Sequence, residues 1–400
     1  MPRISRRKVP DMSRTHVSNS HIHTPYSFSC FDSIEQAVSR ARNEQVRILG
    51  ISDFNTIEGH QEFSRQCEEK RVYPLYNIEF IAFSPEDKER GLRWNDPKNP
   101  GTVYFCGKAL NNPSSFSKDS KNLLSALWKA TQDHIWRVIE KTNEYLKEVN
   151  IPCSLDYSTI RTEYARNTVR ERHVAKALYH AFARKWNDPS QLLEQYRVLF
   201  RDNSFSGNPG NSTAMQNEIR SRLLKAGKPA FVEEKREAFL PLRDIRRMIL
   251  DGGGIPCYPV LTDDSIGLTE YEQDVPLLIE HLRNLRVHAV EFIPARNSFE
   301  HLKSVVKHFH KEGFIVTFGT EHNTPEMVPL APAARNRVPL DNKLMQIGYT
   351  GACILAAHQE QHKKGYPGFV DGKGKRLVSE KEMKSFAEIG EHAINEFIGR

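Results

Sequence analysis

The chain has 400 residues, of which 38% are hydrophobic and 27% charged, values typical of a globular protein with a sizeable core. No apolar run approaches the length of a membrane span, which excludes a membrane-spanning protein. The formal net charge of +7 permits an anionic ligand, but no basic stripe interleaved with aromatic residues accompanies it. We therefore do not expect a nucleic acid partner.

The amino end, residues 1–17, is basic and lacks the apolar stretch of a secretory signal, so we interpret it as a disordered arm. Six cysteines are scattered along the chain without C-x-x-C spacing. This usage suits a reduced, cytoplasmic protein better than a disulfide framework or a cysteine-ligated zinc.

Strand and helix patterns alternate over residues 18–117. Ser33 and Gln36 have capping-box spacing, and the apolar positions that follow them lie on one helix face. Apolar runs predict strands at 46–54, 73–83 and 103–110, with a helix at 59–70.

Residues 118–235 change in character, because the pattern there is charged and helical without a convincing strand. We predict a helical insertion. Alternation resumes over 236–330, and residues 331–400 begin as a Pro-rich loop and end in helices that we expect to pack on the preceding domain. Repeated strand–helix units imply parallel strands, and so many units predict a sheet that closes into a barrel.

Polar and ionisable residues recur on or just after the predicted strands, where barrels carry their chemistry. They are His21, His23, Asp53, Glu79, Tyr258, Glu291, Glu321 and His322. Alternate residues of a strand point to one face, so both imidazoles of His21-Ile22-His23 can reach a common point. Taken alone, this pair is equally compatible with metal ligands and with polar residues at a sheet edge.

Six segments in order resemble motifs of the polymerase-and-histidinol-phosphatase (PHP) superfamily of metal-dependent phosphoesterases. They are HIHTPYSFS, LGISDFNTIEG, NIEF, GGIPCYPV, VEFIP and FGTEHNT. VRERHVAKAL is similar to a segment in the helical insertion of several members, and the resemblance covers residues 18–325. It implies a distorted (β/α)7-type barrel of mainly parallel strands with a helical insertion.

The resemblance also implies a metal site, since members hold up to three ions. The ligands of one ion correspond here to His21, His23, Glu79 and Glu321, the last replacing an aspartate. Two imidazoles and two carboxylates suit zinc, manganese or iron.

Aromatic residues stand where ligands of the other ions are expected, at Phe28, Phe54, Tyr104 and Tyr258. Aromatic rings fill volume and do not hold a dication, so we predict a single divalent ion among aromatic side chains. Either His322 or Asn323 faces the site, depending on the register of the last loop.

The remaining roles are hypotheses about individual side chains. His322, Tyr258 and His173 are the catalytic candidates. Lys108, Arg172 and Arg296 are candidates for binding an anionic substrate, although Arg172 and His173 also suit surface or packing positions on a helix. Asp53 and Glu291 are candidates to hydrogen-bond a ligand histidine.

The leading hypothesis is a metal-dependent hydrolase that cleaves a small phosphoester with water activated on one divalent ion. One alternative is a one-metal enzyme acting on a non-phosphate sugar acid, lactone or amide. The other is a catalytically silent binding protein, against which retention of four ligands argues. Isolated barrels often associate, so homo-oligomerisation stays open.

Overall fold

The computed structural model describes residues 15–263 and 267–399. Residues 1–14 of the predicted basic arm lie outside this part of the chain. Thr15 and His16 are described, and their side chains hydrogen-bond to Gln346 and Asn395. All six cysteines are free.

Seven strands form the main sheet in the order β1-β2-β3-β4-β6-β7-β8. Their bounds are β1 (Val17–Ile22), β2 (Val46–Phe54), β3 (Tyr73–Phe83), β4 (Thr102–Lys108), β6 (Ile255–Val260), β7 (Ala289–Phe292) and β8 (Ile315–Phe318). β4 is antiparallel to β3 and β6, whereas the other neighbours are parallel. Ile22 bridges Glu321 just beyond β8, so the first and last strands meet. The predicted distorted (β/α)7-type barrel is confirmed. The short β5 (Leu240–Pro241) pairs with the end of β3.

The strand period of two places alternate side chains inside the barrel. An apolar layer near the amino ends of the strands contains Leu75, Ile255, Ala289 and Ile315. Inward positions closer to the carboxyl ends are polar, and they include His21, Glu79 and Glu291. A hydrophobic floor therefore lies beneath a buried polar layer.

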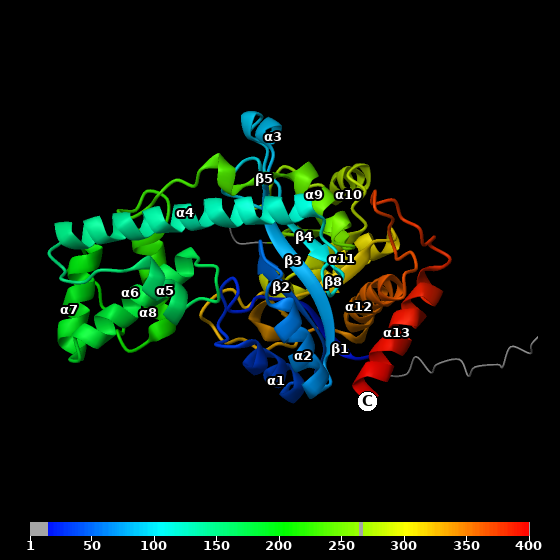
Figure 1. Cartoon of the computed structure of the whole chain (residues 1–400), viewed down its shortest axis with the longest axis horizontal. Coiled ribbons are helices and arrows are strands. Elements are labelled where there is room, and N and C mark those ends of the chain that lie inside the picture. The colour runs from blue at the N-terminus through cyan, green and yellow to red at the C-terminus, as the bar shows by residue number, and fades with distance from the viewer. Residues whose placement is uncertain (1–14, 264–266, 400) are drawn as a thin grey trace, which may run out of the picture.

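Five helices cover the outside of the barrel: α1 (Ile34–Asn43), α2 (His60–Lys70), α9 (Leu242–Asp251), α10 (Val275–Asn284) and α11 (Phe299–Lys311). The predicted cap of α1 is present, because the hydroxyl of Ser33 accepts a hydrogen bond from the backbone N–H of Gln36. The short α3 (Pro85–Glu89) lies on the extended loop between β3 and β4 (Figure 1).

Five further helices come between β4 and β5: α4 (Lys118–Glu148), α5 (Tyr157–Glu163), α6 (Glu171–Lys185), α7 (Pro189–Phe200) and α8 (Ser212–Ile219). They share a hydrophobic cluster of their own. The long α4 extends from the barrel to the outer end of this group (Figure 1). The loop before α6 contacts the barrel, where the backbone N–H of Arg166 donates to the carbonyl of Pro25.

Helices α12 (Asn342–Lys363) and α13 (Met383–Gly399) follow the small hairpin of β9 (Ala333–Ala334) and β10 (Val338–Pro339). α12 packs against the apolar floor of the barrel, and α13 packs on α12. The two helices approach so closely at Gly390 that a Cβ there would lie 1.8 Å from the carbonyl oxygen of Cys353.

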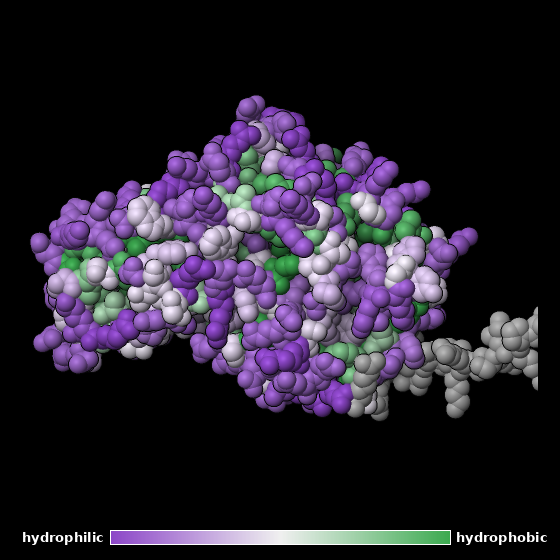
Figure 2. Space-filling model, viewed as in Figure 1, coloured by the Kyte–Doolittle hydropathy of each residue, from purple (hydrophilic) through white to green (hydrophobic). Residues whose placement is uncertain are grey.

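The face seen in Figure 2 is covered mainly by hydrophilic residues, with small hydrophobic patches between them. None of the helices in the described ranges combines the length and the hydropathy needed to cross a bilayer.

Candidate metal centre

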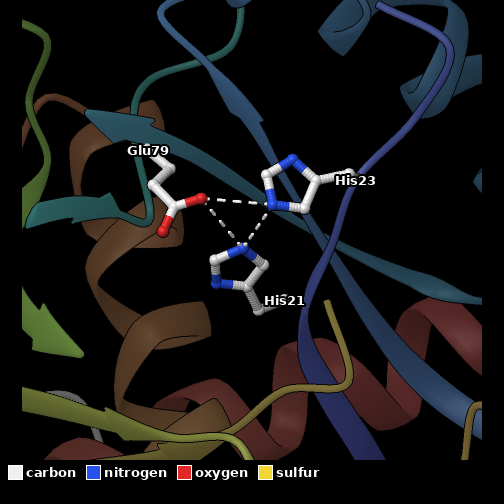
Figure 3. Close-up of side chains that lie close together, drawn as sticks. All are labelled: His21, His23 and Glu79. Carbon is white, nitrogen blue, oxygen red and sulfur yellow. Dashed lines mark hydrogen bonds and ion pairs between the residues drawn. The ribbon is translucent and has the colours of Figure 1, made fainter. Parts of the chain in front are cut away.

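His21 near the carboxyl end of β1, His23 just after it and Glu79 within β3 converge inside the barrel (Figure 3). The Nε2 atoms of His21 and His23 lie 3.2 Å apart. Oε2 of Glu79 lies 3.1 Å from Nε2 of His23 and 3.6 Å from Nε2 of His21. All three side chains are buried.

A carboxylate fixes the orientation of the His21 ring. Nδ1 of His21 lies 2.6 Å from Oε1 of Glu291, which is also buried. Burial favours a protonated Glu291 carboxyl, but Lys108 and His21 outweigh it and lower the pKa of Glu291. The ionised carboxylate accepts, so Nδ1 of His21 donates and Nε2 faces the cluster.

A hydrogen-bonded chain fixes the His23 ring in the same way. The hydroxyl of Ser27 donates to Asp53 at 2.6 Å. The Ser27 oxygen lies 3.0 Å from Nδ1 of His23, and because its proton is already directed to Asp53, it accepts from that nitrogen. Asp53 also receives the backbone N–H and the hydroxyl of Thr24, which anchors the loop that follows His23.

Three electron-donor atoms therefore point at one another when both histidines are neutral. Zinc binds imidazole nitrogen and carboxylate oxygen at about 2.0–2.2 Å, so two ligand atoms of a tetrahedral site lie about 3.3–3.6 Å apart. The separations of 3.1, 3.2 and 3.6 Å fit an ion of this size. The donor set of two nitrogens and one oxygen also fits manganese or iron.

The electrostatics of the cluster favour a positive charge. Burial disfavours the imidazolium, but the carboxylates of Glu291 and Glu79 outweigh burial and raise the pKa of His21 to about 9. Burial likewise disfavours an ionised Glu79, but the two histidines hold the pKa of this carboxyl well below its usual range. The residues fit a divalent cation in charge as well as in spacing.

Glu321, the fourth predicted ligand, is not part of the cluster found among the described residues. Its carboxylate pairs with Arg296 at 2.7 Å, while its backbone carbonyl accepts from the N–H of His23. Glu321 and His322 both have positive φ, at 61° and 57°. Such backbone is costly for residues other than glycine and often marks a functional loop.

The catalytic roles predicted for three residues require correction. The Tyr258 ring lies in the hydrophobic layer outside the barrel, and its hydroxyl donates to Glu272. The His322 ring is engaged at both nitrogens, by Thr320 and by the carbonyl of Val328. His173 accepts the backbone N–H of Arg170, and burial lowers the pKa of His173 to about 3. None of the three offers a proton at the cluster.

The prediction for Lys108 was also wrong. Its ammonium group is fully buried and pairs with Glu291 at 2.7 Å, so it does not face a substrate. Arg172 packs over Phe28, with 5.8 Å between guanidinium and ring centroid, and donates to Asn217. Arg296 stays at the surface, with 41% of its side chain exposed, as the partner of Glu321.

Arg170 was missed as a side chain of the site, and Tyr104 was expected there only as an aromatic ring in place of a ligand. The Phe54 ring stacks on His23, and the Arg170 guanidinium lies 4.8 Å from the Phe54 ring centroid. The Tyr104 hydroxyl has no hydrogen-bond partner among the described residues, and burial, with Asp96 and Glu79, raises the pKa of Tyr104. The sequence shows that Phe54 and Tyr104 are aromatic, but it gives no sign that Arg170, 116 residues after Phe54, lies over the Phe54 ring.

Comparisons with known proteins agree with this architecture. Residues 19–206 match the PHP domain family. An amidohydrolase from Chromobacterium violaceum, solved with bound sulfate and no metal, aligns with a TM-score of 0.51 at 12% identity, covering 82% of this chain and 95% of its own. A candidate metal-dependent phosphoesterase from Bifidobacterium adolescentis aligns with a TM-score of 0.52 at 13% identity, covering 84% and 96%. At these identities the likeness concerns the fold. No curated protein matches the sequence.

The match to the PHP domain family and the buried cluster of His21, His23 and Glu79 support a metal-dependent hydrolase. Residues 19–206, which hold the first three of the six motifs, match the PHP domain family, so the predicted resemblance is confirmed over this segment.

Proposed function

We propose that the protein hydrolyses a small phosphoester with one divalent ion held by His21, His23 and Glu79. The observation that carries the proposal is the convergence of three donor atoms within 3.6 Å of one another inside a buried layer. When both histidines are neutral, three lone pairs at such spacing repel one another, and a cation held among them removes the repulsion.

A single ion is favoured by what surrounds the cluster. Phe54 covers one face of His23, with ring centroids 4.7 Å apart. Tyr104 lies near Phe54, with ring centroids 6.3 Å apart. These rings add volume and no strong ligand, which leaves the histidines and Glu79 as the ligand group.

An anionic substrate is favoured by the cations beside the cluster. Arg170 forms no ion pair among the described residues, and its guanidinium is held over Phe54. Arg296 pairs with Glu321, whose backbone carbonyl accepts from the N–H of His23. Fixed guanidinium groups recognise the oxygens of phosphate or carboxylate, so Arg170 and Arg296 would orient such a group.

A divalent ion bound here supplies an activated water and polarises a substrate oxygen. The protein supplies the rest. Glu291 and Ser27 hold the two imidazoles in the required orientation, and Arg170 compensates charge that develops on the substrate. The Tyr104 hydroxyl donates a hydrogen bond to a substrate oxygen.

The proposal is tested by incubating zinc- or manganese-loaded protein with small phosphomonoesters and phosphodiesters, beside lactones, amides and sugar acids. Phosphate-ester cleavage that is lost in a His21→Ala/His23→Ala variant supports it. Turnover of the non-phosphate compounds alone would replace the phosphoester substrate with the alternative class. Absence of any turnover would favour a binding protein.

A further inference from the structure

Lys108 carries a positive charge in the centre of the barrel. It is the last residue of β4, and its side chain has no exposed surface. The ammonium group donates to Oε2 of Glu291 at 2.7 Å, to the carbonyl of Ser20 at 3.2 Å and to the hydroxyl of Ser52 at 3.4 Å. Lys108 thereby ties β4 to β1, β2 and β7 across the barrel interior.

Glu291 connects this charge to the candidate metal centre. One carboxylate oxygen accepts from Lys108 and the other accepts from Nδ1 of His21 at 2.6 Å. Thr317 adds a weaker contact, at 3.4 Å, to the oxygen that faces Lys108. Both oxygens are engaged, so the carboxylate is fixed in position and in turn fixes the imidazole ring.

The energetics of burial show why the ammonium group matters. A buried carboxylate is costly unless a charge and hydrogen bonds compensate it. Cys106, His21 and Glu291 also lie close enough to form a second candidate group for a cation. The ammonium group already provides a positive charge at Glu291, with no ion required. Because the ammonium group belongs to a side chain, it cannot leave the site as a bound metal ion can.

We propose that Lys108 is a positioning residue, a permanent cation that acts through Glu291 to hold His21 as a metal ligand. The inference rests on the proposed function, because it assumes that His21, His23 and Glu79 bind the ion. Partners that hydrogen-bond a ligand histidine typically contribute 10-fold to 100-fold to metal affinity. Lys108 contributes to metal affinity without touching ion or substrate.

The experiment is a double-mutant cycle on the full chain with Lys108→Met, Glu291→Gln and both together. Methionine keeps the length of the lysine stem, and glutamine keeps an acceptor for His21. The readouts are the dissociation constant for zinc, measured by chelator competition, and the visible absorption spectrum of the cobalt-loaded protein. Lys303→Met is the matched control. Lys303 also forms an ion pair, with Asp341 at 2.8 Å, but this pair lies outside the barrel interior.

We expect each single substitution to weaken zinc binding about 10-fold to 100-fold and to alter the cobalt spectrum. The double variant should bind no more weakly than Glu291→Gln alone, because both residues act through one carboxylate. Lys303→Met should match the wild type.

Unchanged zinc affinity in Lys108→Met, or losses that multiply in the double variant, would overturn the inference. If Lys108→Met does not fold, the double variant still tests the inference, since removing both charges avoids an unpaired buried carboxylate. Zinc binding weaker in the double variant than in Glu291→Gln would show that Lys108 does not act through Glu291 and would overturn the inference. A wild-type protein that binds no zinc or cobalt would contradict the proposed function itself, which is a different result.

Discussion

His23 and Phe54 lie face to face, with ring centroids 4.7 Å apart and planes inclined by 26°. The Arg170 guanidinium lies over the same phenylalanine ring at 4.8 Å. A histidine, an aromatic ring and a cation from the insertion thus form one stack at the candidate metal centre. The stack places a fixed positive charge beside the ligand group and explains why Phe54 is useful where a further metal ligand was expected.

Arg170→Ala is predicted to reduce kcat/KM for an anionic ester such as p-nitrophenyl phosphate by about 10-fold to 100-fold, because a charged hydrogen-bond donor to the substrate is lost. Zinc affinity should stay within about 3-fold of the wild type. Arg161→Ala is the matched control, since Arg161 also lies over an aromatic ring, that of Trp128, at an exposed position. Equal losses in the two variants would mean that Arg170 acts only on folding.

Tyr104→Phe is predicted to lower activity by about 10-fold, corresponding to one lost hydrogen bond of about 1.4 kcal/mol. The fold should be retained, because the Tyr104 hydroxyl has no protein partner to lose among the described residues. Tyr258→Phe should leave kcat/KM nearly unchanged, because its hydroxyl bonds Glu272 outside the barrel. The opposite ranking in steady-state kinetics would restore Tyr258 as the candidate.

Glu79→Gln is predicted to weaken zinc binding by at least about 100-fold, more than the loss of an indirect partner. Glu321→Gln should change it by less than about 3-fold, because the Glu321 carboxylate is paired with Arg296. Chelator competition measures both. A large effect of Glu321→Gln would show that this carboxylate leaves Arg296 and binds the ion, as the sequence motif predicts.

Local patterns were sufficient for most of the barrel. The predicted strands at 46–54 and 73–83 agree in both bounds with β2 and β3, because long apolar runs there end at clear turn signals. The alternation of His21 and His23 correctly brought two imidazoles to one point.

The errors at Tyr258 and Lys108 have a common cause. Strands buried on both faces show no polar alternation, so the sequence does not indicate which side of β6 holds Tyr258. Likewise, a lysine near the end of a strand is usually exposed. Lys108 is buried because its charge is compensated by Glu291, which lies 183 residues further along the chain. Long-range partners of this kind leave no local pattern.

Stability is predicted to fall in mildly acidic solution because of buried neutral histidines. The His358 ring donates to the carbonyl of Gly253 and accepts from the N–H of Phe369, and burial lowers the pKa of His358 from 6.5 to about 3. The unfolded chain therefore binds the extra proton first, so stability is lost as pH falls below about 6.5.

Between pH 7.5 and 5.5 this one histidine should reduce the free energy of unfolding by about 1.4 kcal/mol. Denaturant titrations at the two pH values measure the change. His358→Gln should be less stable at pH 7.5 but lose less on acidification, whereas a His392→Gln substitution at the exposed His392 should leave the difference as in the wild type. An unchanged difference in His358→Gln would contradict the assignment.

The most direct test of the account is the metal content of the purified protein, measured by elemental analysis after loading with zinc or manganese and removal of free ion. We predict one ion per chain in the wild type and none in His21→Ala/His23→Ala. Two or three ions per chain, or an ion retained by the double variant, would contradict a single centre built on His21, His23 and Glu79.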